Sequence, residues 1–355
     1  MKEDLARRLL GKVMGWSAPE LVELGGRLQT LARIKYDDYE GFRPGEKFLE
    51  SLAGWLEPFR PDDRVRLVAF ILESLVYISR PELDHLIDTI YPDIIRPALL
   101  TATALKLNEP EHRVRYLAAS DAFRRTQRSM LICGLSDGAR LDRLRRGSRQ
   151  LSNEQFYPSP ELTDAVQASS LAKLRAALSD SEATFDRVVL LEDFSGSGFS
   201  LLRNKAGLLD GKLWRAHEAL ARLTERGVLA STHTVWLVVY VAAEQARAAL
   251  LDGLAATGWG WQLRVGMTLG DVSIVDSRLL ELATGWFDPI LVTDHLKKGG
   301  SDGALGFAAE ALPLVLFHNT PNNSISLLWG DSTGRAGALD RRALFPREER
   351  HRAES

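Results

Sequence analysis

The segment from Val188 to Ser200 combines residue types that can hold a sugar phosphate. Four apolar residues come first, then the acids Glu192 and Asp193, and then a loop of serine and glycine. The apolar run predicts a buried strand, and in an open α/β sheet the carboxyl end of such a strand faces the ligand crevice. Two carboxylates there can accept hydrogen bonds from sugar hydroxyls, while the loop lets backbone N–H groups approach a phosphate. A helix expected from Leu201 onward would add its positive end.

Other phosphate-binding or catalytic motifs fit this segment less well. The loop consists of Ser195, Gly196, Ser197, Gly198, Phe199 and Ser200. A P-loop requires Gly-Lys-Ser/Thr, and this loop has no lysine. A dinucleotide fingerprint requires a third glycine where this chain has Leu201. A nucleophile elbow at Ser197 requires a small residue where Phe199 stands. The plainer alternative is a strand followed by a glycine-rich turn, with both acids facing water.

A second strand end, earlier in the chain, also carries a short loop that could bind an anion. The expected strand is Met130–Gly134, and the loop after it consists of Ser136, Asp137, Gly138, Ala139 and Arg140. The surrounding segment 113–149 holds ten arginines against three aspartates. Arginine binds phosphate groups in bidentate fashion, which makes this loop a candidate pyrophosphate site. The alternatives are an ordinary turn and a solvated basic helix face.

A third polar cluster follows the expected strand Leu312–His318. The side chains of His318, Asn319, Asn322 and Asn323 gather hydrogen-bond donors and acceptors at one strand end, where a base or a ribose could be recognised. A hairpin turn explains the same residues equally well.

The rest of the pattern predicts an α/β protein with an open, mostly parallel sheet and flanking helices, preceded by an all-helical region. Short apolar strands alternate with helical segments after residue 110, which is typical of buried parallel strands. Helical spacing and a capping box at Ser17 and Glu20 predict helices before it. We therefore expect a helical region over 1–110, a sheet domain over 111–331 and a polar tail over 332–355. The expected strands are Ser129–Gly134, Arg187–Glu192, Thr234–Ala242, Trp261–Val265, Pro289–Val292 and Leu312–His318.

Composition narrows the class of protein. The formal net charge of the 355 residues is -2, so we expect no general affinity for nucleic acid or for acidic membranes. The single cysteine, Cys133, excludes an internal disulfide and fits a reducing cytoplasm. The first residues lack the apolar run of a signal peptide, and no apolar stretch approaches the length of a membrane span. We expect a cytoplasmic protein that does not cross a membrane.

The segment 188–200 resembles the phosphoribosyl pyrophosphate motif of type I phosphoribosyltransferases, which has four apolar residues, two acids and a loop ending Thr-Gly-x-Thr. Glu192 and Asp193 match the ribose-binding acids, and Ser197, Gly198 and Ser200 match the Thr, Gly and Thr of the phosphate loop. Together with the segments 134–140, 151–155 and 318–329, the motif is most similar to the PRTase-CE domain of bacterial conflict, or antiphage, systems.

The resemblance implies a ligand and a chemistry. The ligand would be phosphoribosyl pyrophosphate, bound with Mg²⁺, or a nucleotide. Among the side chains, only Asp193 is a candidate to contact the metal ion. An active enzyme would transfer ribose 5-phosphate to a base and release pyrophosphate, with Glu192 and Asp193 as catalytic acids. The alternative is a sensor without catalysis that regulates a partner effector, and the N-terminal helices could dock such a partner protein.

Overall fold

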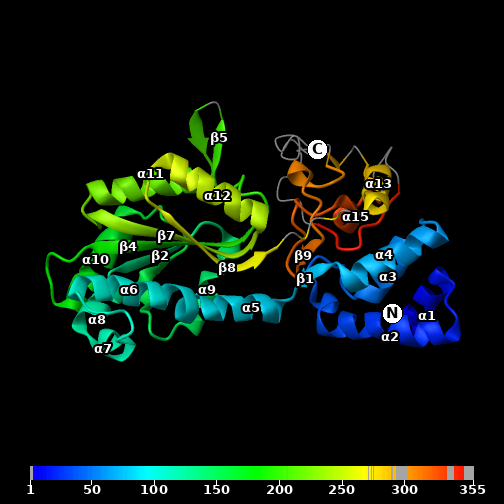
Figure 1. Cartoon of the computed structure of the whole chain (residues 1–355), viewed down its shortest axis with the longest axis horizontal. Helices are drawn as coiled ribbons and strands as arrows, with labels where there is room; N and C mark the ends of the chain where they lie inside the picture. Colours follow the sequence, from blue (N-terminus) through cyan, green and yellow to red (C-terminus); the bar gives the residue numbers. More distant parts are fainter. Residues whose placement is uncertain are drawn as a thin grey trace. The chain divides into compact units, whose positions relative to one another are not determined.

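In the computed structural model the chain folds into two units (Figure 1). The sheet unit is Leu83–Asp271, and the split unit combines Met1–Glu82 with Val272–Ser355. The structure describes residues 3–205, 207–270, 272, 274, 276–288, 291–292, 303–333 and 340–347. This division differs from the boundaries expected at 110 and 331, because helices before residue 110 pack with the sheet and the segment after 272 packs with the N-terminal helices.

The sheet unit is built on five parallel strands, which confirms the predicted fold class. The strand order is β3-β2-β4-β7-β8, and every pairing between neighbours is parallel. The four strands predicted between residues 129 and 265 are all present, each with somewhat different ends. The bounds are β2 (Met130–Gly134), β3 (Phe156–Tyr157), β4 (Phe185–Ser195), β7 (Leu229–Ala243) and β8 (Gln262–Leu269).

Helices cover both faces of this sheet, as the apolar strands require. The four residues Val188–Leu191 of β4 are fully buried. On one face, α10 (Asp164–Leu178), α11 (Lys212–Glu225) and α12 (Glu244–Thr257) contribute leucines to the core. In Figure 1, α11 and α12 lie on one side of the sheet, and α6 (Arg96–Leu107) and α9 (Leu141–Gly147) lie on the other. A strand buried on both faces needs no polar alternation, which explains the continuous apolar runs in the sequence.

The remaining elements of the sheet unit are short helices and one hairpin. The hairpin pairs β5 with β6 in antiparallel fashion. The bounds are α5 (Arg80–Thr89), η2 (Ile90–Ile95), α7 (Val114–Ala119), α8 (Asp121–Arg128), η3 (Asp137–Ala139), η4 (Asn153–Gln155), β5 (Arg203–Lys205) and β6 (Leu208–Asp210).

The split unit joins the N-terminal helices to the C-terminal segment through a two-stranded parallel sheet of β1 and β9. The predicted capping box is confirmed, since the Ser17 N–H donates to Glu20 Oε2 at 2.8 Å at the start of α2. The bounds are α1 (Glu3–Met14), α2 (Ala18–Ile34), η1 (Tyr36–Asp38), α3 (Phe48–Leu56), α4 (Pro61–Glu73), β1 (Val76–Ile78), α13 (Ser277–Trp286), η6 (Phe307–Ala309), β9 (Leu314–Leu316) and α15 (Ser326–Trp329).

One expectation for the C-terminal part needs correction, and a second lies partly outside the described residues. Within the segment expected to be a polar tail, Ala343, Leu344 and Phe345 are fully buried, because this apolar triplet packs into the split unit although the residues around it are rich in arginine. The expected strand Pro289–Val292 lies partly outside the described residues. Among the helices that the structure describes, none is both long enough and apolar enough to cross a membrane.

Candidate functional site at the carboxyl edge of the sheet

The two strand ends singled out in the sequence are neighbours in the sheet. β2 pairs with β4 in a register that places Gly134 opposite Leu191. If the five strands of this sheet are numbered one to five along the chain, their order across the sheet is 2-1-3-4-5. The direction in which the chain winds therefore reverses between β2 and β4. Open α/β sheets bind ligands at the carboxyl side of this switch point. The turn after β2 and the acids at the end of β4 therefore meet where a ligand site is expected.

Glu192 is buried beside this turn and is held by protein partners. Its side chain accepts a hydrogen bond from Ser136 Oγ at 3.1 Å and forms an ion pair with Lys212, the first residue of α11. The residue is only 4% exposed. Its second carboxylate oxygen, Oε2, has no hydrogen-bond partner. Oxygen Oε1 of Glu192 thus interacts with protein groups, whereas Oε2 accepts no hydrogen bond from the protein.

The surroundings of Glu192 raise the pKa of its carboxyl group. Burial, together with the neighbouring Asp193 carboxylate, raises the pKa of Glu192 to about 7, although Lys212 and Ser136 act in the opposite direction. A carboxyl whose pKa is higher in the folded state than in the unfolded chain binds a proton on folding. The bound proton stabilises the folded state. This stabilisation is fully present below the pKa of the unfolded chain, near 4.5, and is lost as the pH rises toward about 7.

Glu192→Gln is therefore expected to flatten part of the pH dependence of stability. In the wild type, Glu192 should lower the free energy of unfolding by up to about 1 kcal/mol for each pH unit between pH 5 and pH 7. The glutamine variant lacks this contribution, because it cannot ionise. Urea unfolding at several pH values measures the difference. Parallel curves for the wild type and the variant would show that Glu192 ionises normally.

Asp193 points to the opposite face of the sheet, because successive strand residues alternate. Its carboxylate is partly exposed, and one oxygen accepts the N–H of Phe194 at 2.9 Å. The turn after β2 comes very close: a Cβ on Gly138 would lie 2.3 Å from Asp193 Oδ2. Tyr240 of β7 fixes this turn, since its buried hydroxyl donates to the Ala139 carbonyl at 2.6 Å. Only glycine at position 138 allows the backbone to approach the carboxylate in this way.

Gly138→Ala should turn the Asp193 carboxylate away from its present position. The added methyl group cannot occupy the space of Oδ2, and the short aspartate side chain can yield by rotating. The position needs no left-handed backbone, so the cost in folding stability should stay within about 1 kcal/mol. A crystal structure of the variant would reveal the rotation. An unmoved Asp193 in that structure would contradict the predicted close packing.

The serine–glycine loop forms two hydrogen bonds between its own residues. The Gly198 N–H donates to Ser195 Oγ at 3.2 Å, and the Phe199 N–H donates to Ser197 Oγ at 3.3 Å. Gly198 has a φ of 75°, which favours glycine. Ser195, Gly196 and Gly198 are buried, whereas Ser200 is exposed. Within the described residues, the N–H groups of Ser197 and Ser200 donate to no protein acceptor.

The expected helix after this loop is wrong. The chain instead makes the hairpin β5–β6 and begins α11 only at Lys212. The N–H groups of Leu201 and Leu202 bond back to the Gly198 carbonyl at 3.0 and 2.9 Å, which forms one turn and no more. No helix start therefore follows the loop directly. The loop's own N–H groups remain its means of binding an anion.

A hollow of about 240 Å³ lies next to Glu192 on the side of α11. Lys212 and Arg215 place two cations at its wall, and Ser136 and Ser159 contribute hydroxyls. No sequence pattern indicates these cations, because they lie on an ordinary helix that only the fold brings to the switch point. The lining residues are Gly134, Leu135, Ser136, Asp137, Pro158, Ser159, Pro160, Glu161, Lys212, Arg215 and Ala216.

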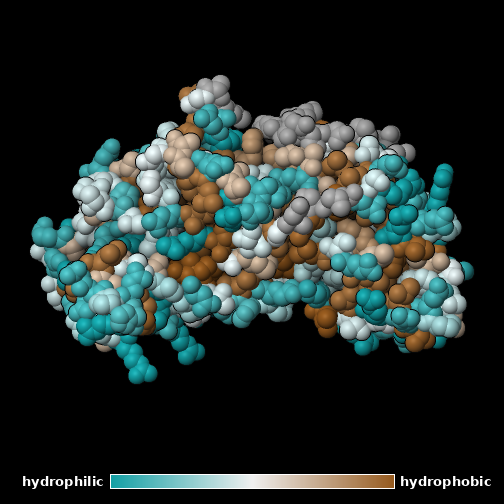
Figure 2. Space-filling model, viewed as in Figure 1, coloured by the Kyte–Doolittle hydropathy of each residue, from teal (hydrophilic) through white to brown (hydrophobic). Residues whose placement is uncertain are grey.

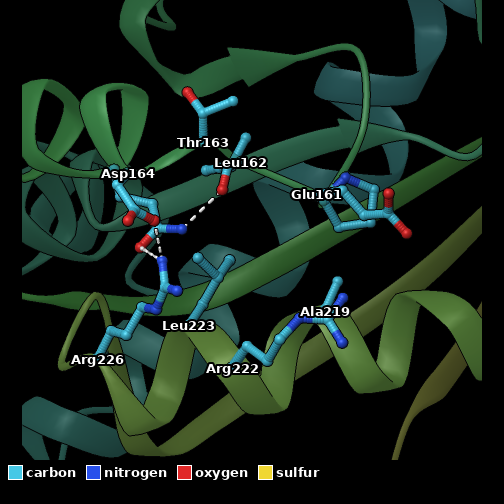
Figure 3. A pocket seen from close by; sticks show the side chains of 10 residues that line it. Glu161, Leu162, Thr163, Asp164, Ala219, Arg222, Leu223 and Arg226 are labelled. Carbon is cyan, nitrogen blue, oxygen red and sulfur yellow. Dashed lines mark hydrogen bonds and ion pairs between the residues drawn. The ribbon is translucent and has the colours of Figure 1, made fainter.

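A second hollow of about 220 Å³ continues along α11 and shares Pro160 and Glu161 with the first. Figure 3 shows Arg226 pointing toward Asp164, with which it forms an ion pair. Gln167 joins the same network, since it accepts from Arg226 at 3.3 Å and donates to the Leu162 carbonyl at 2.6 Å. Arg226, Asp164 and Gln167 thus satisfy one another at this end, which makes the first hollow the better candidate for a ligand.

The candidate base- or ribose-binding residues belong to the split unit, whereas the two acids belong to the sheet unit. Asn319 N–H donates to the Leu316 carbonyl at 3.0 Å, and the Asn322 carbonyl accepts from Phe307 at 2.7 Å. Asn323 is buried, and the ring of His318 lies against Phe317. These contacts form a turn around the end of β9. A role of His318, Asn319, Asn322 and Asn323 in recognising a ligand stays a prediction.

The site suits a magnesium ion only if the ligand supplies most of the oxygen atoms. Among the described residues, no three His, Cys, Asp or Glu side chains come together as a metal site. Mg²⁺ usually binds through one or two carboxylates together with substrate phosphates and water. The partly exposed carboxylate of Asp193 fits the role of a single protein carboxylate in such a site.

Comparison with known proteins agrees with the motif. The family model PRTase-CE matches residues 52–347, a range that begins in α3 and includes all of the sheet unit and part of the split unit. No curated protein and no solved structure matches the chain. Since the matched range covers most of the sequence, the chain belongs to the PRTase-CE family and is phosphoribosyltransferase-like.

Proposed function

We propose that the carboxyl edge between β2 and β4 binds a phosphoribosyl compound, either phosphoribosyl pyrophosphate or a nucleotide. The observation that carries this proposal is the approach of Gly138 to the partly exposed carboxylate of Asp193 at the switch point of the sheet. A turn that fits tightly around a carboxylate fixes its direction before a ligand arrives. Such a fixed acceptor suits the vicinal hydroxyls of a ribose.

Each part of the ligand has a matching group. The free N–H groups of Ser197 and Ser200 would hold the 5-phosphate, together with their hydroxyls. Lys212 and Arg215, which line the hollow beside Ser136, would attract the pyrophosphate. Arg140 on the same turn remains our candidate for a further contact. Bound Mg²⁺ would neutralise charge on the pyrophosphate, and Asp193 would be its only side-chain contact.

In the catalytic form of this proposal, a base nitrogen attacks the anomeric carbon of the ribose. The bond from that carbon to the pyrophosphate oxygen breaks, and its electron pair leaves with the pyrophosphate. Positive charge develops on the sugar, and the carboxylate of Asp193 would stabilise it. Lys212 and Arg215 would stabilise the negative charge on the leaving group. The resemblance to conflict-system proteins supports an antiphage setting for this reaction.

A sensor without turnover is the second candidate, and the state of Glu192 favours it. One of its oxygens is occupied by Ser136 and Lys212, and its raised pKa reduces its charge near neutrality. A carboxyl in this state is a poor second acceptor for ribose. A sensor would act on a partner protein, and exposed apolar side chains on the helices α1 and α2 could dock one (Figure 2). They are Leu5, Leu9, Val22 and Ile34.

Calorimetry and a turnover assay separate these functions. The full chain is titrated with phosphoribosyl pyrophosphate, ribose 5-phosphate and AMP, each with and without Mg²⁺. Binding of the pyrophosphate compound that strengthens with Mg²⁺ supports the site. Release of pyrophosphate on addition of nucleobases supports the enzyme, and binding without release supports the sensor. Absence of binding for all three compounds at millimolar concentration would overturn the proposal.

A further inference from the structure

A third hollow, of about 480 Å³, lies at the other end of α11 from the switch point. Helix α11 begins with Lys212 beside Glu192 and ends at Glu225, which lines this hollow. At about 1.5 Å per residue the two ends of the helix are roughly 20 Å apart. The lining residues are His217, Leu220, Ala221, Thr224, Glu225, Ser231, His233, Trp259 and Trp261, and none of them lines the hollow beside Glu192.

Aromatic rings form one wall of this hollow. His217 stacks on Trp259 with ring centres 4.3 Å apart and planes within 10°. Trp261 is tilted by 50° against Trp259 at 4.8 Å, and Trp214 adds a further ring behind Trp259 at 6.2 Å. All four side chains are partly exposed. Trp259 and Trp261 pack against the core of the sheet unit yet keep part of their surface exposed, and a ligand ring can contact that part.

Several polar groups that line the hollow can accept hydrogen bonds. His233 Nδ1 lies 2.9 Å from the Ala230 carbonyl, which can only accept, so this nitrogen carries the proton. The other ring nitrogen of a neutral His233 is then an acceptor. Burial lowers the pKa of His217, although the nearby Glu218 carboxylate acts in the opposite direction, so the neutral imidazole is favoured. The Glu225 carboxylate is a further acceptor at the rim.

We propose that this hollow binds a purine base that presents N–H donors on its edge, as guanine does. Flat rings can stack on Trp259 and Trp261, and the volume falls within the usual range of small-molecule sites. A carboxylate such as that of Glu225 can accept two adjacent N–H groups of guanine. This second site is independent of the phosphoribosyl site, since it requires neither a phosphate nor the two acids of β4.

Nucleosides test this inference without probing the phosphate site. The full chain is titrated with guanosine, inosine and uridine, and binding is followed by calorimetry and tryptophan fluorescence. Guanosine should bind more tightly than inosine, which lacks the exocyclic amino group, and uridine should bind most weakly. Trp261→Leu should weaken guanosine binding about tenfold. Glu225→Gln should remove the preference for guanosine over inosine.

Control variants keep the test decisive. Trp261→Phe retains a ring and should retain most of the binding, while Trp16→Leu removes a partly exposed tryptophan of the split unit and should change nothing. The inference is overturned if no nucleoside binds the wild type, or if guanosine binding survives both Trp261→Leu and Glu225→Gln. Should Trp261→Leu fail to fold, Glu225→Gln and Trp261→Phe decide the outcome.

Discussion

Asp193→Asn is expected to weaken the binding of phosphoribosyl pyrophosphate by about ten- to a hundredfold. A hydrogen bond to a charged group contributes about 1.5–3 kcal/mol, and the neutral amide loses this charge. The amide also brings an NH₂ group toward the turn at Gly138, which already packs against the carboxylate. Titration calorimetry with Mg²⁺ measures the loss. In an active enzyme, pyrophosphate release should slow as well, because the developing positive charge on the sugar loses its counter-charge.

A matched control separates the role of Asp193 from general charge effects. Asp142 lies on the same unit, is exposed, and pairs only at 3.6 Å with Arg146. Asp142→Asn removes the same charge and should leave the affinity within a factor of about two. Equal affinities for wild type and Asp193→Asn would show that this carboxylate does not contact the ligand.

Phe345→Ala is expected to lower the free energy of unfolding of the split unit by about 3–5 kcal/mol. The ring is fully buried, and five aromatic rings surround it. Phe48 stacks on it at 5.6 Å, and Tyr39 meets it edge-on at 5.2 Å. Truncation would leave a cavity among rigid rings that cannot close over it. The five rings are Tyr36, Tyr39, Phe42, Phe48 and Tyr77.

Urea unfolding followed by near-ultraviolet circular dichroism measures this change. Val22→Ala is the control, since Val22 of α2 is 73% exposed in the same unit and its truncation should cost less than about 0.5 kcal/mol. A loss as small as that of Val22→Ala would mean that the segment around Phe345 is detached in solution, as its polar neighbours led us to expect from the sequence.

Local pattern was sufficient to predict the sheet. The runs Met130–Gly134 and Val188–Leu191 are apolar because both faces of their strands are buried, and such runs need no knowledge of distant residues. The capping box at Ser17, which the sequence also predicted, is equally local. The same pattern predicted that the acids of β4 face a ligand crevice, and the family resemblance added the expectation that they bind ribose.

The arrangement of the two acids was harder to predict. The expected strand ended at Glu192, whereas β4 continues to Ser195. Serine and glycine are weak strand formers, so their presence suggested an early end. Because the strand continues, Glu192 and Asp193 point to opposite faces of the sheet, and their two carboxylates have different surroundings.

The cations and the C-terminal packing depend on tertiary structure. Lys212 reaches Glu192 because the hairpin β5–β6 returns the chain to the end of β4, which no local signal shows. The division into units has the same origin, since the pairing of β1 with β9 joins residues more than two hundred positions apart. Composition suggested a tail after residue 331, but three apolar residues were enough to anchor the segment around Phe345.

The most direct test of the phosphoribosyl site is a crystal structure of the full chain with phosphoribosyl pyrophosphate and Mg²⁺. We predict ribose hydroxyls within hydrogen-bond distance of Asp193 and the 5-phosphate on the N–H groups of Ser197 and Ser200. A ligand that binds elsewhere, with no contact to Asp193 or to that loop, would contradict the account.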